Sequence, residues 1–379
     1  MIPEPAKENG PLDAPNLTVQ SVEAEFSLID FIRDRYTITR LELTGPHVEI
    51  HVGSDGSVDT GIALPQSVGP SNISVANATI SGGEMRISDA RSGDAYLASD
   101  VGGELRLEAL RGPFSFAGSG IMDGQGYNLR LSTGLLADDG TATLSATLRP
   151  VDDRYSLSVE GTMKPGLLPT FSGTMAYRQK PPRPAEGEKD DAGRGDFVVT
   201  SRVEASPAKV LLGDYTVIPD ENRAATRLLG AADLSLGPNM KFNAVISGGM
   251  LALPPRDATA EQTVEPYEIV RLLRELPIPS APALTGTLGI DIAELELRAF
   301  SLRNVRLDAT AKDGGWDVQS FTGDLPGDSK LRLSGRVTTD TGHAEFSGTV
   351  SLASTRLDAL STLWRKPADG NPLFNMPGT

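Results

Sequence analysis

The sequence predicts a mainly β protein with one large antiparallel sheet, and two observations carry this prediction. Apolar and polar residues alternate in many short segments, which is the pattern of strands with one face against apolar material and one face in water. Short glycine-rich turns separate these segments, in a chain that holds 40 Gly and 27 Pro. The alternating segments are 37–43, 47–52, 104–107, 114–116, 127–131, 143–148, 155–159, 233–236, 241–245, 330–333 and 344–350.

Three segments have helical spacing, and we expect each to cap or plug one end of the sheet. They are 27–35, 265–276 and 354–365. The second has the strongest pattern, because Pro266 suits a first helical turn and Ile269, Leu272 and Leu276 form a stripe.

One charged segment divides the chain. Residues 178–195 (RQKPPRPAEGEKDDAGRG) have no apolar side chain beyond alanine, which is typical of a flexible loop. We therefore expect a disordered or linker N-terminus over 1–16, a first β segment over 17–177, a second over 196–366 and a tail over 367–379. Segments 112–134, 229–249 and 324–352 resemble one another as turn, strand, glycine and strand, which indicates duplication of a hairpin unit.

The charge balance argues against two kinds of partner. With 35 basic and 50 acidic residues the net charge is −15, whereas nucleic acid binding needs many cationic contacts with phosphates. Electrostatic adhesion to an anionic membrane surface is equally unfavourable.

The absence of cysteine excludes disulfides and thiol chemistry. No apolar run approaches the roughly 18 residues of a membrane-spanning helix.

The segment 47–52 (HVEIHV) contains the strongest candidate for a metal or catalytic site. In a strand, His47, Glu49 and His51 project from one face, about 7 Å apart at successive positions, and could hold zinc or iron. The only other histidine is His343, and the residues between the three polar ones are apolar. We therefore interpret them as the solvent-facing side of a half-buried strand.

The other chemical motifs are turns or are missing. Asp55-Gly56 resembles a calcium loop superficially, but the later oxygen ligands and the closing Glu are lacking, so we predict a hairpin turn. The sequence has no glycine-rich phosphate loop and no G-x-S-x-G motif, and three scattered histidines leave little room for a catalytic triad. We expect no enzymatic activity, no metal and no cofactor.

The candidate functional surface is therefore the apolar face of the sheet. If two sheets pack together, this face is the core of a sandwich or barrel; if one curved sheet stays open, it is accessible to acyl chains. Periodicity leaves both arrangements open. The residues expected to line such a groove are Val48, Ile50, Val52, Leu105, Leu107, Phe114, Phe116, Leu129, Leu131, Leu331 and Leu333.

The order of segments resembles the bacterial AsmA-like family. Residues 19–59 follow its pattern of a V-x-x-V strand, an L-x-x-L segment, an I-x-x-L-x-L-x-x-P-x-V-x-L stretch and an acidic-Gly turn. Further similar segments are 73–89 (ISVANATISGGEMRISD), 105–120 (LRLEALRGPFSFAGSG) and 325–364, from LPG to the stretch ending in LSTLW. The resemblance weakens over 163–222. Family members usually begin with a membrane-spanning helix and continue further, and this chain shows neither feature.

The resemblance implies a repeating, taco-like β-groove, that is, a long curved antiparallel sheet with a few short capping helices. It implies a periplasmic location, anchored to the bacterial inner membrane by an N-terminal helix outside this chain. The implied function is that of TamB-related bridge-like lipid-transfer proteins: binding or conducting phospholipids along the groove for outer-membrane biogenesis and lipid homeostasis. The implied partners are phospholipid acyl chains and components of both membranes.

Two other classes of function compete with lipid transport. A structural or assembly factor of the outer membrane would act through an exposed strand edge that pairs with a partner strand, without conducting lipid. An envelope hydrolase would need His47 or His51 in a cleft beside carboxylates.

Overall fold

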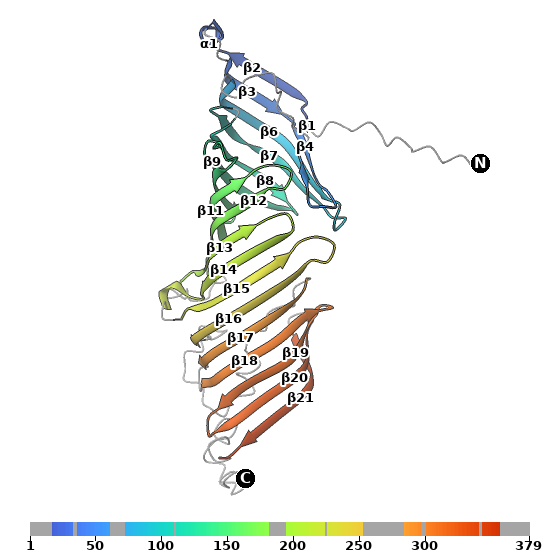
Figure 1. Cartoon of the computed structure of the whole chain (residues 1–379), viewed down its shortest axis with the longest axis vertical. Helices are drawn as coiled ribbons and strands as arrows, with labels where there is room; N and C mark the ends of the chain where they lie inside the picture. The colour runs from blue at the N-terminus through green and yellow to red at the C-terminus, as the bar shows by residue number, and fades with distance from the viewer. Residues whose placement is uncertain are drawn as a thin grey trace, which may run out of the picture. The chain divides into compact units, whose positions relative to one another are not determined.

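The computed structural model describes residues 17–32, 36–60, 73–109, 111–181, 195–223, 226–252, 284–296, 301–340 and 343–356. They contain twenty-one strands, one short α-helix and one 3-10 turn, and the strands belong to one mixed sheet (Figure 1). The predicted mainly β fold with one large sheet is confirmed. The helix expected at 265–276 lies outside the described residues. Of the helix expected at 354–365, Ser354 ends the last strand and residues 357–365 lie outside the described part.

The chain divides into two compact units, Met1–Gly173 and Thr174–Thr379. This division falls inside the strand Thr170–Gln179, slightly before the predicted boundary at 178–195. Residues 182–194 of that predicted boundary lie outside the described part. Unit 1 contains α1 (Leu28–Ile32), β1 (Leu17–Thr18), β2 (Ser21–Phe26), β3 (Tyr36–Thr44), β4 (His47–Val52), β5 (Val58–Asp59), β6 (Ile73–Asp89), β7 (Ala95–Leu107), β8 (Phe114–Met122), β9 (Gln125–Thr133), β10 (Ala142–Pro150), β11 (Tyr155–Lys164) and the first part of β12 (Thr170–Gln179).

Unit 1 starts with the β2–β3 hairpin, and β3 and β4 then run parallel to β6. β2 pairs antiparallel with β3, β1 pairs antiparallel with β4, and β6 runs parallel to β3 with its first half and to β4 with its second. Gly45 and Pro46 separate β3 from β4. Gly45 adopts φ 60°, and its N–H donates to the Ser81 carbonyl at 2.8 Å, so the interruption is itself tied to β6. From β6 to β11 each strand pairs antiparallel with the next.

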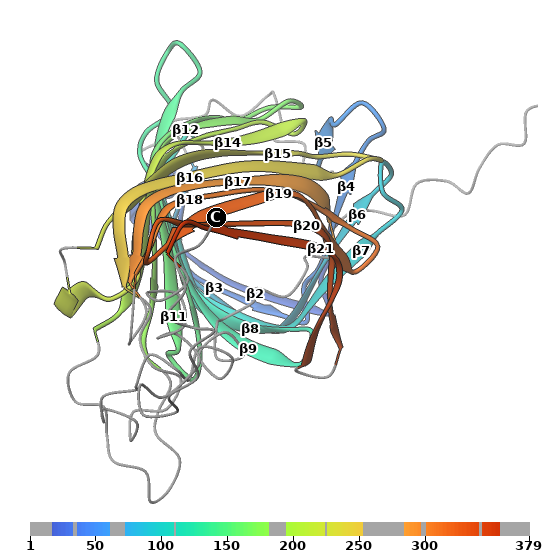
Figure 2. The same ribbon diagram turned by 90° about the horizontal axis from the view of Figure 1, so that it is seen from below.

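Unit 2 continues the meander and contains most of the buried core. It comprises β13 (Phe197–Ala205), β14 (Lys209–Ile218), the 3-10 turn η1 (Glu221–Arg223), β15 (Leu228–Ser235), β16 (Lys241–Ala252), β17 (Thr285–Glu296), β18 (Ser301–Lys312), β19 (Gly315–Leu325), β20 (Ser329–Asp340) and β21 (His343–Ser354). β16 and β17 pair in parallel, and the two strands bend along their length (Figure 2). Because of these parallel pairs the sheet is mixed and not purely antiparallel as predicted. Alternation indicates which side chains share a face, but it does not indicate the direction of the neighbouring strand.

Two apolar clusters form the core of unit 2. The first is Leu228, Ile292, Leu302, Val305 and Leu325, with Leu331 among the half-buried residues packed against it. The second is Ala309, Ala311 and Trp316, whose indole meets Phe242 edge-on with ring centroids 6.5 Å apart. These residues lie on strands β15 to β20, so one face of this part of the sheet is a true hydrophobic core.

Bulges with left-handed Asp or Asn residues interrupt the long strands in both units. Asp100 in β7, Asp214 in β14 and Asn304 in β18 all have φ near 50°, and each lies at a shift in strand register. Asp and Asn tolerate this backbone region better than other non-glycine residues. A bulge bends its strand and increases the local twist, so these positions give the strands curvature.

The predicted hairpin repeat has a physical basis in paired glycines. Gly103 lies opposite Gly118 in unit 1, and Gly335 lies opposite Gly348 in unit 2. A Cβ added to Gly118 or Gly348 would approach a carbonyl oxygen of the facing strand within 2.3 Å and the phenyl ring two residues earlier within 2.8 Å. In each F-x-G unit the aromatic ring thus lies over its glycine and covers the backbone there. Gly173, after Phe171, shows the same arrangement against Gly161.

Candidate functional site: the apolar face of unit 1

Strand register places the predicted lining residues of unit 1 on one face of its sheet. Leu105 lies opposite Phe116, which lies opposite Leu131, and Leu107 lies opposite Phe114. In an antiparallel ladder, directly opposite residues share a face, so these side chains form continuous cross-strand rows. Leu129 continues the surface opposite Leu148 of β10.

The β4 residues extend these rows on the same sheet. Val48 lies opposite Met85 and Ile50 opposite Ile87 of β6, and Met85 in turn lies opposite Ala98 of β7. Val52 lies opposite Asp89, so the apolar row ends there. We call the surface made by these residues of β4 and β6 to β10 the unit 1 apolar face.

The unit 1 apolar face is half exposed. Across β7 to β11 every described apolar side chain is at least partly accessible except Pro150, and Phe114 is exposed. Single-layer packing explains this, because a sheet face without a second layer against it stays in contact with solvent. The two predicted lining residues of unit 2 are half-buried as well. Leu331 packs against the first buried cluster, and Leu333 lies opposite Phe321 and the exposed Val350.

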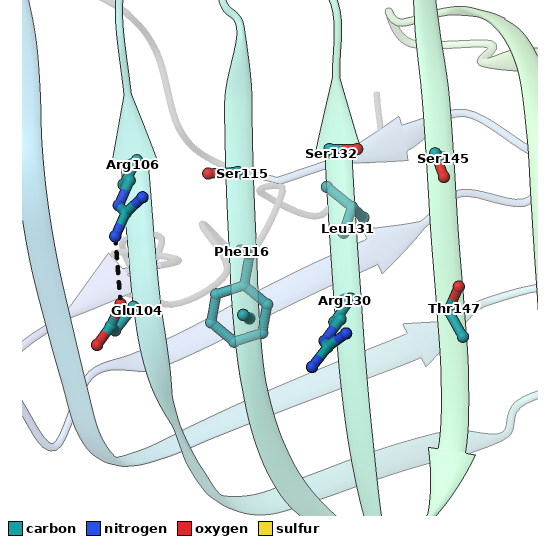
Figure 3. Close-up of a pocket in the computed structure, with 10 residues that line it drawn as sticks. Glu104, Arg106, Ser115, Phe116, Arg130, Leu131, Ser132, Ser145 and Thr147 are labelled. Carbon is teal, nitrogen blue, oxygen red and sulfur yellow. Dashed lines mark ion pairs between the residues drawn. The ribbon is translucent and has the colours of Figure 1, made fainter.

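The opposite face of the same strands carries a polar hollow of about 430 Å³. Its lining residues come from β7 to β10 and alternate with the apolar rows, apart from Phe116 and Leu131 (Figure 3). They are Glu104, Arg106, Ser115, Phe116, Ala117, Arg130, Leu131, Ser132, Ser145 and Thr147. Short hydroxyl side chains lie between longer charged ones, and Arg106 pairs with Glu104 at 3.7 Å. Such a surface suits water and polar groups rather than an acyl chain.

The sequence pattern did not single out this hollow, although it contained a signal for it. Ser115 and Ser145 occupy alternate positions of two predicted strands, and Ser132 directly follows a third, 127–131. Their position in one cross-strand row depends on register, which the sequence does not encode directly.

The histidine-containing segment forms a network of polar side chains on the solvent-facing side of β4. Glu49 lies between the two histidines, 3.4 Å from His47 Nε2 and 3.5 Å from His51 Nε2, and Glu84 approaches His47 Nδ1 at 3.6 Å. His51 Nδ1 is 2.7 Å from the Ser88 hydroxyl. All four charged or titratable side chains are substantially accessible. Within the described ranges, no group of three or more His, Asp or Glu side chains is arranged to hold a metal ion.

The acidic glycine turn is a hairpin turn, as predicted. β4 pairs antiparallel with β5, and the turn between them is closed by the Gly53 N–H, which donates to the Ser57 carbonyl at 2.7 Å. The Asp55 carboxylate accepts hydrogen bonds from the Ser57 hydroxyl and N–H at 2.6 and 2.9 Å. These hydrogen bonds lower the pKa of Asp55. Its carboxylate thus stabilises the turn.

Helix α1 differs from the expected cap. Its apolar side chains are exposed rather than packed against the end of a sheet, and the described contact is an edge-on one between Phe31 and Tyr36 with ring centroids 6.0 Å apart. None of the helices in the part of the chain that the structure describes is long and apolar enough to cross a bilayer.

No protein-family model matches this chain, and neither a curated protein nor a solved structure matches it.

Proposed function

We propose that this chain is the periplasmic portion of an inner-membrane-anchored AsmA-like protein, and that it binds or conducts phospholipids along the unit 1 apolar face for outer-membrane lipid homeostasis. The observation that carries the proposal is the combination of continuous apolar rows with incomplete burial. The rows from Leu105 through Phe116 to Leu131 have the chemistry of an acyl-chain surface, and their side chains stay accessible.

The energetics of lipid binding fit such a surface. Transfer of apolar area from water contributes about 25 cal/mol per Å², so an acyl chain laid over half-exposed Leu and Phe side chains removes apolar area on both partners. Polar residues point to the other face, and no charged side chain interrupts the row from Leu105 to Ala146. Binding of this kind needs no catalytic group.

Neighbouring residues on opposite faces give the sharpest test. A photoactivatable benzoyl-phenylalanine at Phe116 faces the apolar rows, whereas the same group at Ala117 faces the polar hollow. Irradiation with a labelled phospholipid should give a crosslink at 116 and not at 117. Equal crosslinking at both positions, or no phospholipid in native mass spectra of the purified chain, would contradict the proposal.

A second pair of variants measures the contribution of the face. Leu131→Asp places a charge in the apolar row and should lower crosslinking at 116 by at least about tenfold, since burial of one large apolar side chain corresponds to that factor or more. Ser132→Asp adds the same charge to the opposite face and serves as the matched control. An equal loss in both variants would indicate a general effect of charge.

One observation favours a structural or assembly role as the second candidate. In the described part of the chain β21 pairs only with β20, and its Phe346, Val350 and Leu352 are exposed. A partner strand could extend the sheet there. Two results together would assign the function to the β21 edge. Val350→Asp would abolish capture of a protein partner, and the unchanged chain would show no lipid crosslinking at Phe116.

A further inference from the structure

The loop between β2 and β3 ends in an ordered apolar tip formed by Leu28, Ile29, Phe31 and Ile32 of α1. Their exposed fractions are 77%, 67%, 63% and 84%. Figure 1 shows α1 at the end of the β2–β3 hairpin, beyond the strands of unit 1. Four adjacent large apolar side chains with this exposure are unusual on a soluble surface, where such residues normally occur singly.

Local hydrogen bonds hold the apolar tip in place. The Ser27 N–H donates to the Thr37 carbonyl at 3.1 Å, which fixes the base of the tip to β3. The Ser27 hydroxyl accepts from the Asp30 N–H at 3.3 Å, and the Ser27 carbonyl accepts from the Phe31 N–H at 3.0 Å. Phe31 also meets Tyr36 edge-on. The exposure therefore belongs to a defined turn with its own cap.

The distribution of side chains on α1 is the reverse of that on a solvent-facing helix. Asp30, its one charged residue, is only partly exposed, while the four apolar residues project into solvent. At 100° per residue, positions 28, 29, 31 and 32 lie within an arc of about 160°, and Asp30 lies on the opposite side of the turn. Such an amphipathic turn can place its apolar side in a membrane interface while its charged residue faces away from the acyl chains.

The local charge balance is compatible with a bilayer surface, unlike that of the whole chain. Between Ser27 and Arg40 the sequence has three arginines and two aspartates, whereas the whole chain has a net charge of −15. Tyr36 and Phe26, exposed next to the tip, add aromatic rings of the kind that occur at membrane interfaces. Arg side chains can also extend towards lipid headgroups.

We propose that the apolar tip inserts into the interface of a phospholipid bilayer and docks unit 1 on a membrane. The inference goes beyond the proposed function and does not depend on it, because α1 lies outside the rows of the unit 1 apolar face. Insertion is driven by the apolar side chains, so it should occur on neutral lipid and should gain little from anionic lipid.

The absence of cysteine makes a site-specific test straightforward. The full chain carrying Ile29→Cys, labelled with an environment-sensitive dye, is mixed with vesicles of phosphatidylcholine alone or with added phosphatidylglycerol. The dye should move into an apolar environment on both kinds of vesicle. A dye at Leu168→Cys is the matched control, because Leu168 is 61% exposed in the loop between β11 and β12. It should remain in water.

Vesicle flotation of unlabelled variants completes the test. Ile29→Ser/Phe31→Ser should reduce the vesicle-bound fraction at least about tenfold, since removal of one buried large apolar side chain corresponds to roughly that factor. Leu167→Ser/Leu168→Ser should bind as the unchanged chain does. Circular dichroism should show an unaltered strand signal in both variants, because the tip residues make few contacts with the sheet.

Three results would overturn the inference. One is a dye at position 29 that stays in water on every vesicle. Another is equal binding of the tip variant and the unchanged chain. The third is a dye signal that rises with protein concentration when vesicles are absent, which would show that a second copy or another protein surface covers the tip. Lipid crosslinking at Phe116 in vesicle-free solution is scored separately, so failure of the tip and failure of the lipid-binding face are distinguishable.

Discussion

The two units have the same alternating pattern but treat their apolar faces differently. Of the thirteen buried apolar side chains of the core in the described residues, only Val75 and Ala78 belong to unit 1. The other eleven lie in unit 2, mainly on β17 to β19. Alternation specifies a strand with one apolar side. Whether that side becomes a core or an accessible surface depends on whether other side chains pack against it.

The largest expected effect separates the core of unit 2 from the face of unit 1. Ile292→Ala removes a side chain that is 4% exposed within the first cluster, and it should lower the free energy of unfolding by about 2–5 kcal/mol. Leu129→Ala, in the half-exposed face, should cost about 1 kcal/mol. Urea denaturation measures both costs when it is followed by tryptophan fluorescence for unit 2, to which Trp316 and Trp364 belong, and by circular dichroism for the whole chain. Equal costs would remove the distinction between core and open face.

An intermediate effect should be shared by both units, because the paired glycines occur in each. Gly118→Val and Gly348→Val place side-chain atoms against a facing carbonyl and a covering phenyl ring. Each should destabilise its unit by about 1–3 kcal/mol through overpacking. Gly249→Ala is the control, since no atom lies within 4 Å of the added Cβ, and it should change stability by less than about 0.5 kcal/mol. Tolerance of valine at both paired positions would contradict this account of the repeat.

The smallest expected effect concerns one ion pair in each unit and its dependence on pH. Asp89, at the end of β6, accepts hydrogen bonds from the Arg91 side chain at 2.6–3.2 Å, and these lower the pKa of the Asp89 carboxyl. Because the folded pKa lies below the unfolded one, the stabilisation is fully present above the unfolded pKa of about 3.9 and is lost as pH falls through the folded pKa. Asp89→Asn should therefore cost about 1 kcal/mol at neutral pH.

The matching pair in unit 2 gives the control. Glu221 accepts hydrogen bonds from Arg178 at 2.5 and 3.0 Å, and its pKa is lowered in the same direction. This pair is more accessible than the Asp89 pair, so solvent screens it more strongly. Thermal melts from pH 3 to 7 should show the deficit of Asp89→Asn vanish in acid and a smaller deficit for Glu221→Gln. A deficit of Asp89→Asn that persists unchanged in acid would show that the charge is not its cause.

Much of the sheet was predictable because period two is a strong local signal. The rows through Leu105, Phe116 and Leu131 follow from three alternating segments whose apolar positions share a face once they pair. The acidic turn at Asp55 was predictable for the same reason, since Asp-Gly chemistry acts within a few residues. The placement of His47, Glu49 and His51 on the accessible side of β4 also followed from alternation.

Other features depend on contacts between residues far apart in the chain. The parallel pairing of β6 with β3 and β4, and of β17 with β16, leaves no trace in alternation. The polar hollow needs Ser115, Ser132 and Ser145 in register across three strands. Helix α1 was predicted from its apolar spacing as a cap, and the spacing holds no information on whether anything lies against it.

The sequence by itself determined that this protein consists of one-sided strands, where its tight turns lie, and which side chains share a face, because these follow from local backbone geometry. Only the tertiary structure decided that the apolar side is a packed core in unit 2 and an accessible surface in unit 1, and that the side chains of α1 project into solvent. The physical reason is that burial depends on what approaches a face, and that is a property of the whole fold rather than of any one strand.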